Sequence, residues 1–143
     1  MAEITKIGIA VLDAGRILLV KKHGAQAYIL PGGKPEGSEN YLQTLIREVD
    51  EELGCRVDVT SVSFLGDFVD EAAGMPGVTV KVKLYRGNLV GNPKPKSEIE
   101  QMRWFSREDR QTLDVAPSLK NLIFPFLFGN LSNCPADRRS ATI

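Results

Sequence analysis

A glycine-rich turn that leads into an acidic helix constrains this 143-residue chain more than any other feature of its sequence. Residues 31–33 are Pro-Gly-Gly, and residues 39–53 then place apolar side chains at helical spacing. Glu48, Glu51 and Glu52 lie three and four residues apart in that helix, so about 100° per residue puts them on one side. Like charges at this spacing destabilise a helix unless a cation offsets them. The pattern predicts a divalent-metal site, with a solvated acidic face as the alternative.

Two neighbours of these glutamates are expected to behave differently from them. Asp50 points away from the other acids of the helix, so we expect solvent rather than a metal around it. Arg47 lies four residues before Glu51, within reach of an ion pair. One guanidinium cannot neutralise three carboxylates, so the helix keeps an excess of negative charge for a cation.

The rest of the chain predicts mostly β-structure around this helix. Ser38 is the expected N-cap and Gly54 the expected stop. The stripe expected to face the core is Leu42, Leu45, Ile46, Val49 and Leu53. Strands are expected at residues 4–12 and 16–22 (a hairpin), 27–30, 56–69, 78–90 and 100–105, and a terminal helix at 117–128. These elements predict an α+β fold, an α/β/α sandwich in which a mixed β-sheet is flanked by the acidic helix and a C-terminal helix.

Composition and charge narrow the classes of protein. The chain has 18 basic and 18 acidic residues, so neither nucleic acid nor a membrane is an expected partner. No stretch approaches the ~20 apolar residues of a membrane span, and the N-terminal apolar run is too short for a signal peptide. Cys55 and Cys134 fit no zinc spacing, so we expect free thiols and a cytoplasmic location. We expect one domain over residues 1–130 and a flexible tail over residues 131–143.

The stretch from Gly33 to Cys55 resembles the Nudix box, G-x5-E-x7-R-E-U-x-E-E-x-G-U, in which U is a bulky apolar residue. Cys55 is a mild departure at the final apolar position. Residues 27–33 and 102–105 are also similar to strands of this family, so the resemblance covers roughly residues 4–128. The matching positions are Gly33, Glu39, Arg47, Glu48, Val49, Glu51, Glu52 and Gly54. The resemblance, to MutT-like members in particular, implies the Nudix fold.

The resemblance also implies a reaction and a cofactor. Nudix hydrolases cleave a pyrophosphate within a nucleoside diphosphate linked to another group, with Mg²⁺ expected here and Mn²⁺ as an alternative. Glu51 and Glu52 are then implied as the main metal ligands. Glu48 is implied as a third ligand or as the base that activates water, and the Gly32 carbonyl as a backbone ligand.

Other residues of the box receive supporting roles from the same resemblance. Arg47 is implied to orient the glutamates, Glu39 to hold the loop against the helix, and Gly54 to end the helix. MutT-like members add a glutamate before the late strand, as metal ligand or base. Glu98 is the preferred residue here, because its segment can turn inward, and the alternatives are Glu100 or neither residue.

Substrate contacts are predicted less directly. Tyr28 is placed to stack on a base, with a half-buried strand tyrosine as the alternative. Lys22 is placed to meet phosphates, with a solvated edge-strand lysine as the alternative. Gly33 and Lys34, at the start of the box, are further substrate-binding residues that we expect. Residues 70–74 hold neither the proline typical of ADP-ribose enzymes nor the tyrosine typical of dinucleotide-polyphosphate enzymes. By elimination, a nucleoside triphosphate is the expected substrate.

Several other interpretations stay open. The enzyme could instead act on ADP-ribose or a nucleotide sugar. A non-catalytic nucleotide-binding module is a further alternative, although such modules usually lose box glutamates that this chain keeps. The apolar run of residues 124–128, Phe-Pro-Phe-Leu-Phe, exceeds what a small core needs, so we also expect a possible homodimer.

Overall fold

Seven strands are divided between two sheets in the computed structural model, which describes residues 2–111 and 113–129. The larger sheet has the order β4-β1-β6-β5, with β1 and β6 parallel and the other pairs antiparallel. The smaller, antiparallel sheet has the order β2-β3-β7. The strands are β1 (Ala2–Ala10), β2 (Leu12–Asp13), β3 (Arg16–Lys22), β4 (Gly32–Gly33), β5 (Arg56–Glu71), β6 (Val78–Val90) and β7 (Ile99–Phe105).

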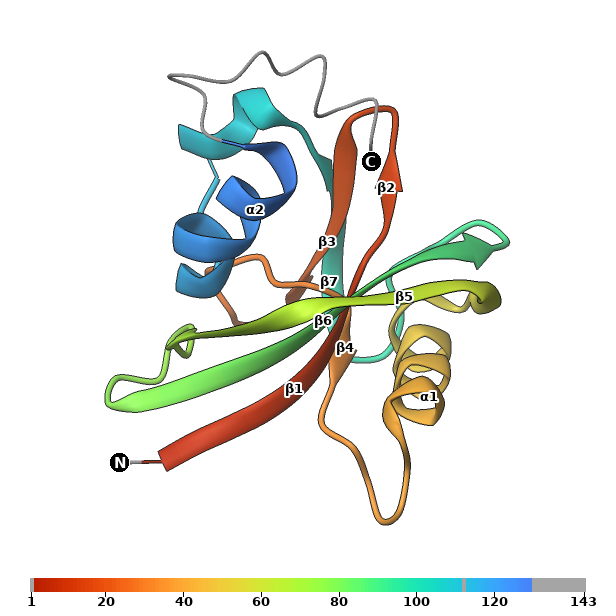
Figure 1. Cartoon of the computed structure of the whole chain (residues 1–143). Helices are drawn as coiled ribbons and strands as arrows, with labels where there is room; N and C mark the ends of the chain where they lie inside the picture. Colours follow the sequence, from red (N-terminus) through yellow and green to blue (C-terminus); the bar gives the residue numbers. More distant parts are fainter. Residues whose placement is uncertain (1, 112, 130–143) are drawn as a thin grey trace.

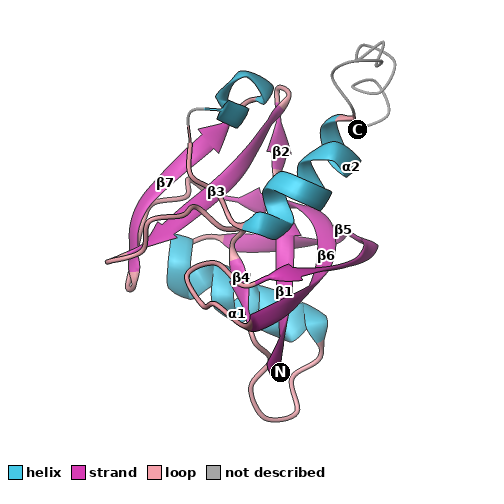
Figure 2. Cartoon of the chain, turned by 90° about the vertical axis from the view of Figure 1, so that its left-hand side faces the viewer, coloured by secondary structure: helices cyan, strands magenta, loops and turns pink. Residues whose placement is uncertain are grey.

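Helices lie on opposite sides of the strands. Helix α1 (Tyr41–Leu53) packs on one side of the larger sheet, and the helical segment that ends in α2 (Phe124–Phe128) packs on the other (Figure 1). Figure 2 shows the same separation from the side. The predicted α+β sandwich with a mixed sheet and two flanking helices is confirmed, although the division into two sheets was not predicted.

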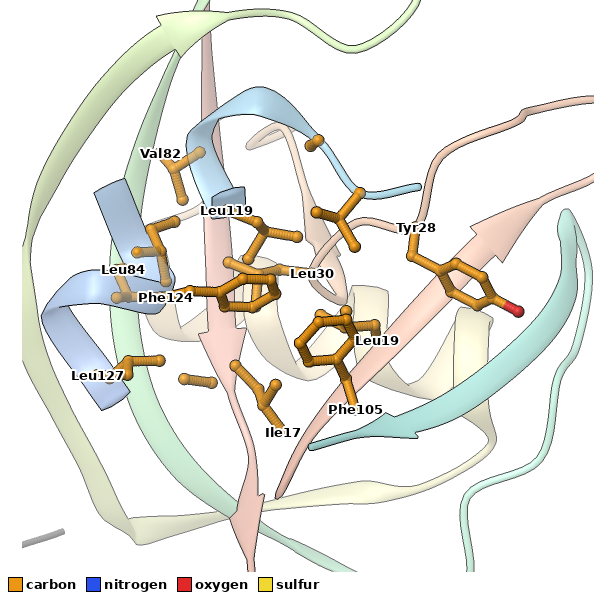
Figure 3. Packing of buried hydrophobic residues seen from close by; sticks show 14 of the residues in the cluster. Ile17, Leu19, Tyr28, Leu30, Val82, Leu84, Phe105, Leu119, Phe124 and Leu127 are labelled. Carbon is orange, nitrogen blue, oxygen red and sulfur yellow. The ribbon is translucent and has the colours of Figure 1, made fainter. Parts of the chain in front are cut away.

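Two apolar clusters fill the space between these layers. Because side chains alternate along β1, Ile7 and Ile9 pack against Leu45 and Val49 of α1. On the other side, residues of β3, β6 and β7 pack against the C-terminal helical segment (Figure 3). Phe105 and Phe124 stack there with ring centroids 4.6 Å apart. The C-terminal segment therefore completes the domain.

The start of α1 differs from the prediction. Asn40, not Ser38, is the N-cap: its side chain accepts from the Gln43 amide at 2.8 Å, and the Gln43 side chain accepts from the Asn40 amide at 2.9 Å. This reciprocal capping box satisfies two donors at once, which a serine two residues earlier does not. Gly54 ends the helix as predicted, with φ +66° and its N–H donated to the Asp50 carbonyl.

The predicted apolar stripe of α1 is partly wrong. Leu45, Val49 and Leu53 are buried, but Ile46 is 41% exposed. Thr44 and Glu52 are buried in its place, which rotates the buried face of the helix toward its polar flank. Their hydrogen bonds replace the apolar contacts that the pattern assumed: Thr44 Oγ1 donates to Glu39 at 3.1 Å, and Glu52 accepts from Gly32.

Several other boundaries also differ. The run expected as one strand over residues 4–12 is two strands in different sheets, so the hairpin is only the short β2–β3 pair around Ala14 and Gly15. Residues 27–30 form isolated bridges rather than a strand. The terminal helix covers the predicted residues 117–128, but its middle, Leu119–Ile123, is a π-helical turn before α2. Pro125 follows that turn and has no N–H for a regular α-helical hydrogen bond, which explains the irregularity.

The aromatic run at the C-terminal end is mostly used within this chain. Phe124, Leu127 and Phe128 are buried, and Phe126, 48% exposed, meets the Phe68 ring edge-on at 5.3 Å. The run therefore provides less surplus apolar surface than expected, and the homodimer stays a prediction. The predicted tail, residues 131–143, lies outside the described residues. Within the part of the chain that is described, no helix is long and apolar enough to cross a membrane.

Candidate functional site

Gly32 and Glu52 join the glycine turn to the acidic helix. The Gly32 backbone N–H donates to Oε1 of Glu52 at 3.1 Å. Glu52 is only 1% exposed, and its other oxygen, Oε2, is buried with no hydrogen-bond partner among the described residues. A buried carboxylate oxygen without a partner is costly to desolvate. The site therefore holds an oxygen ligand prepared for a donor or a cation.

Burial shifts the acid–base balance of this site. Burial raises the pKa of Glu52 to about 7, against the opposing charge of Lys6. The pKa of Glu48 is also raised, mainly by burial. Lys6, on the neighbouring strand β1, has a pKa lowered to about 8 by burial, with Glu52 acting in the opposite sense. Such a cluster of perturbed groups at a cavity marks a functional site.

Arg47 connects the loop to the helix. Its Nε donates to Glu39 at 2.7 Å, its Nη1 to Glu48 at 3.1 Å, and its Nη2 to the Lys34 carbonyl at 3.0 Å. These bonds raise the pKa of Arg47, chiefly through Glu39, and the same contact lowers the pKa of Glu39 to about 2. A planar, multiply bonded guanidinium fixes the direction of the carboxylates that it contacts.

Glycines allow the turn to approach these groups. A Cβ on Gly33 would overlap the Glu48 carboxylate, so the Glu48 side chain fills the space that a side chain at position 33 would need. Gly32 has φ +139°, and a Cβ there would overlap the Ile7 carbonyl of β1. The turn therefore needs glycine at position 32, where backbone meets backbone, whereas a side chain at position 33 would displace the Glu48 carboxylate.

Glu51 lies apart from the other two glutamates. Its side chain is 53% exposed and accepts from Arg47 Nη1 at 3.4 Å. Within residues 2–111 and 113–129, no three His, Cys, Asp or Glu side chains converge as a metal cluster. The structure therefore brings Glu48 and Glu52 to the glycine turn and leaves Glu51 exposed and paired with Arg47. Asp50 is exposed, as predicted.

A cavity of about 690 Å³ opens beside these carboxylates. Its polar end includes Glu48, Glu98 and three lysines, Lys6, Lys22 and Lys34. The remainder is mostly aliphatic, from β1, β6, the β5–β6 loop and the segment before α2, and includes Ile4, Met75, Val80, Val82 and Leu119. A pocket of this size with few polar groups at one end is typical of a small-molecule site.

The segment before β7 brings Glu98 to this cavity. The amides of Lys94 and Lys96 donate to the Leu53 and Glu52 carbonyls at 3.0 and 2.9 Å, which ties the segment to the end of α1. Glu98 then forms an ion pair with Lys22 at 3.4 Å. Glu100 points elsewhere, to Lys21 at 3.6 Å, and does not line the cavity. The geometry favours Glu98 over Glu100.

Tyr28 does not reach the cavity. Its ring is buried in the cluster of Figure 3, and its hydroxyl, which points away from that cluster, donates to Gln101 at 2.6 Å. Tyr28 is therefore a core tyrosine with a satisfied hydroxyl, and the stacking predicted for it finds no support. Lys22, Lys34 and Gly33 do line the cavity, as expected for substrate-binding residues.

Lys6 is the site residue that sequence reasoning missed. It lines the cavity between the carboxylates and the apolar end, and its ammonium donates to the Leu30 carbonyl at 2.8 Å. A signal was available, because Lys6 interrupts the apolar alternation of a strand between Ile4 and Gly8. A charge at an inward position of a strand needs a partner or a function.

Comparison with known families decides the family of this fold and site. A family model described as the NUDIX domain matches residues 4–124. The chain belongs to the NUDIX family. It is therefore a Nudix hydrolase, and Nudix hydrolases generally use divalent cations.

Solved structures agree with this family. A MutT NUDIX hydrolase from Burkholderia pseudomallei is 26% identical, with a TM-score of 0.63 over 74% of this chain and 84% of that chain. A Nudix hydrolase family member from Chromobacterium violaceum is also 26% identical, with a TM-score of 0.65 over 97% and 86%. A MutT protein from Bacillus halodurans is 25% identical, with a TM-score of 0.64 over 81% and 76%. Among curated proteins, no match is found.

Proposed function

We propose that this Nudix hydrolase is a pyrophosphohydrolase of nucleoside triphosphates that uses Mg²⁺, with Mn²⁺ as an alternative. One observation carries the proposal: Glu52, buried with an unpartnered oxygen, lies with Glu48 against the glycine turn, beside a cavity lined by three lysines. Carboxylates and ammonium groups at one end of an apolar cavity fit a diphosphate with an organic group attached.

The donor set fits a hard divalent cation. Glu52, Glu48 and, after a rotamer change, Glu51 would hold it, with the Gly32 carbonyl as a further oxygen ligand. All of these ligands are oxygens, which Mg²⁺ and Mn²⁺ prefer, and the buried Oε2 of Glu52, without a hydrogen-bond partner among the described residues, supports this assignment. When bound, such a cation polarises phosphate oxygens and offsets the charge that develops on them.

The side chains of the site carry out the proton transfer and the positioning that hydrolysis requires. A water oxygen forms a bond to one phosphorus while the bond from that phosphorus to the bridging oxygen breaks, giving a nucleoside monophosphate and pyrophosphate. Glu98 accepts the proton of the water in this proposal, because its ion pair with Lys22 is long and exposed, whereas Arg47 holds the less exposed Glu48 by a hydrogen bond of 3.1 Å. Arg47 holds Glu39, Glu48 and the loop in fixed positions relative to one another. Lys22 and Lys34 bind phosphate oxygens at the rim of the cavity.

The choice of a triphosphate rests on elimination and on the cavity. Residues 70–74 lack the markers of two other substrate classes, and 690 Å³ accommodates a nucleoside. The structural relatives include MutT proteins at 25–26% identity. A UDP-X diphosphatase, at 16% identity, shares only the fold. ADP-ribose, nucleotide sugars and binding without turnover are therefore outcomes of the test.

A substrate panel tests the proposal. Purified protein is incubated with Mg²⁺ or Mn²⁺ and with nucleoside triphosphates, oxidised triphosphates, ADP-ribose, nucleotide sugars and dinucleotide polyphosphates, and the products are separated by chromatography. Pyrophosphate and a monophosphate from a triphosphate are expected. Turnover of ADP-ribose or a nucleotide sugar alone would replace the substrate class. Calorimetric binding without turnover with either metal would indicate a binding module.

A further inference from the structure

Lys6 occupies an unusual place for a lysine. Strand β1 lies inside the larger sheet, between β4 and β6, and Lys6 pairs with Val82 in the parallel register. Its side chain lies on the cavity side of β1 with Ile4, whereas Ile7 and Ile9 pack toward α1. Lys6 is half-buried, so water meets its charge only in part and the protein or a ligand must meet the remainder.

The protein meets that charge only in part. The ammonium has three N–H donors, and the 2.8 Å bond to the Leu30 carbonyl uses one of them. Within the described residues, Lys6 makes no ion pair at contact distance, in contrast to Lys22, which pairs with Glu98. Bonding to Leu30 fixes the ammonium at the cavity wall and leaves two donors for a group inside it.

The surroundings restrict what that group can be. The charged residues that act on Lys6 most strongly are Glu52 and Lys22, followed by Glu48 and Glu98. On its other side the cavity is aliphatic, with Ile4, Val80 and Val82. Lys6 therefore marks the boundary between the carboxylate end and the apolar end. If a cation takes the carboxylates, the anion left for Lys6 is the one that the substrate brings.

We propose that Lys6 is a substrate-binding residue, whose ammonium donates to a non-bridging phosphate oxygen where the diphosphate joins the organic group. This inference rests on the proposed function for the diphosphate, but it concerns binding and not turnover. The competing role is structural: Lys6 would only balance the charge of Glu52 and hold the carboxylates in place. The two roles predict opposite behaviour toward a cation, since a ligand-binding lysine repels the metal and a structural one preserves its site.

Two affinities separate these roles. Calorimetry measures the binding of inorganic pyrophosphate in the presence of Mg²⁺, and electron paramagnetic resonance measures the binding of Mn²⁺ alone. The variant Lys6→Gln keeps a donor for the Leu30 carbonyl but removes the charge, and Lys6→Arg keeps the charge. Lys83→Gln is the matched control, because Lys83 lies on the other side of neighbouring strand β6, pairs with Asp67 at 3.3 Å and does not line the cavity.

In Lys6→Gln we expect pyrophosphate affinity to fall by about tenfold or more, the scale of a charge-assisted hydrogen bond, and Mn²⁺ affinity to stay or rise. Lys6→Arg should retain most of the pyrophosphate affinity, and Lys83→Gln should change neither value. Unchanged pyrophosphate affinity in Lys6→Gln overturns the assignment. So does a parallel loss of both affinities, which is the signature of the structural role.

A measurement on the wild-type protein covers the case in which Lys6→Gln does not fold. Lysines are labelled with ¹³C at Cε, the Lys6 signal is assigned by its absence in Lys6→Arg, and pyrophosphate with Mg²⁺ is added. The Lys6 signal should shift while that of Lys83 stays, and an unmoved Lys6 signal overturns the proposal. A shift together with no turnover of any nucleotide would instead refute the proposed function and leave the Lys6 assignment in place.

Discussion

Gly32 donates its backbone N–H to Glu52 across 3.1 Å, so the glycine turn and the last turn of α1 share one buried hydrogen bond. The bond uses one oxygen of Glu52 and leaves the other, Oε2, without a partner among the described residues. The turn thus fixes the orientation of the Glu52 carboxylate but does not neutralise its charge. The buried, unpartnered oxygen should lower the stability of the folded protein, and this cost can be measured.

The variant Glu52→Gln should separate stability from activity. We expect turnover to fall by about 100-fold or more, because the proposed main oxygen ligand becomes a weak one. We also expect the melting temperature of the metal-free protein to rise at about pH 8, because a neutral amide avoids the desolvation of a buried carboxylate. Burial raises the pKa of Glu52 to about 7, so this carboxylate is mostly charged under those conditions.

Asp50→Asn is the control for that comparison, since Asp50 lies on the same helix but is exposed. Kinetics with Mg²⁺ and thermal unfolding with a chelator would be measured for both variants. If Glu52→Gln melts below the wild type while Asp50→Asn does not, the carboxylate contributes more through its contacts than its burial costs.

Gly33→Ala should disable the site by moving Glu48. The added Cβ would overlap the Glu48 carboxylate, so this side chain must shift. A misplacement of about 1 Å costs on the order of 100-fold in rate, which sets the expected loss. Gly37→Ala in the same loop is the matched control: its φ of +57° is strained for alanine, but nothing lies near its Cβ. Steady-state kinetics should show the loss in Gly33→Ala alone, and equal losses would point to loop strain instead.

Most of the fold could be predicted from local patterns, and the errors in strand pairing came from contacts distant in sequence. The acidic helix was predicted because spacing and a terminal glycine are local signals. The split of residues 4–12 between two sheets was not, because both halves alternate in the same way and only their partners differ. The apolar pattern also places Ile46 in the core, because the hydrogen bond from Gly32 that accompanies the burial of Glu52 comes from outside the helix.

The residues of the candidate site also fall into two groups, those that a local motif predicts and those whose positions depend on distant contacts. Glu48, Glu52 and Arg47 belong to one motif, so their proximity follows from fixed spacing. Tyr28 and Lys6 are outside it, and their positions depend on which side of a strand faces the cavity. The alternation of β1 predicts that Lys6 lies opposite Ile7, but not that the side with Lys6 is the hollow one. That fact depends on the C-terminal segment, more than a hundred residues later.

Glu98→Gln should reduce turnover far more than Glu100→Gln. Glu98 lines the cavity and pairs with Lys22, whereas Glu100 pairs with Lys21 outside it. Loss of a general base lowers the rate by about 100-fold or more, so we expect kcat to fall by that amount in Glu98→Gln. In Glu100→Gln, kcat should stay within about twofold of the wild-type value. Both values come from saturation kinetics on the best nucleotide of the panel. Comparable activity in the two variants would return the role of base to Glu48.

Glu39 should control the stability of the loop in acid. The hydrogen bonds from Arg47 lower the pKa of Glu39 to about 2, below its ordinary value of 4.5. The ionised carboxylate therefore stabilises the folded state fully above about pH 4.5, and this contribution is lost as the pH falls toward 2. The free energy of unfolding of Glu39→Gln, from urea titrations at several pH values, should be lower than that of the wild type near neutrality and decline less steeply in acid.

Glu36→Gln is the control, because Glu36 is exposed and 3.6 Å from Arg47, so its curve should parallel that of the wild type. Parallel curves for Glu39→Gln as well would show that the contact with Arg47 does not couple to folding.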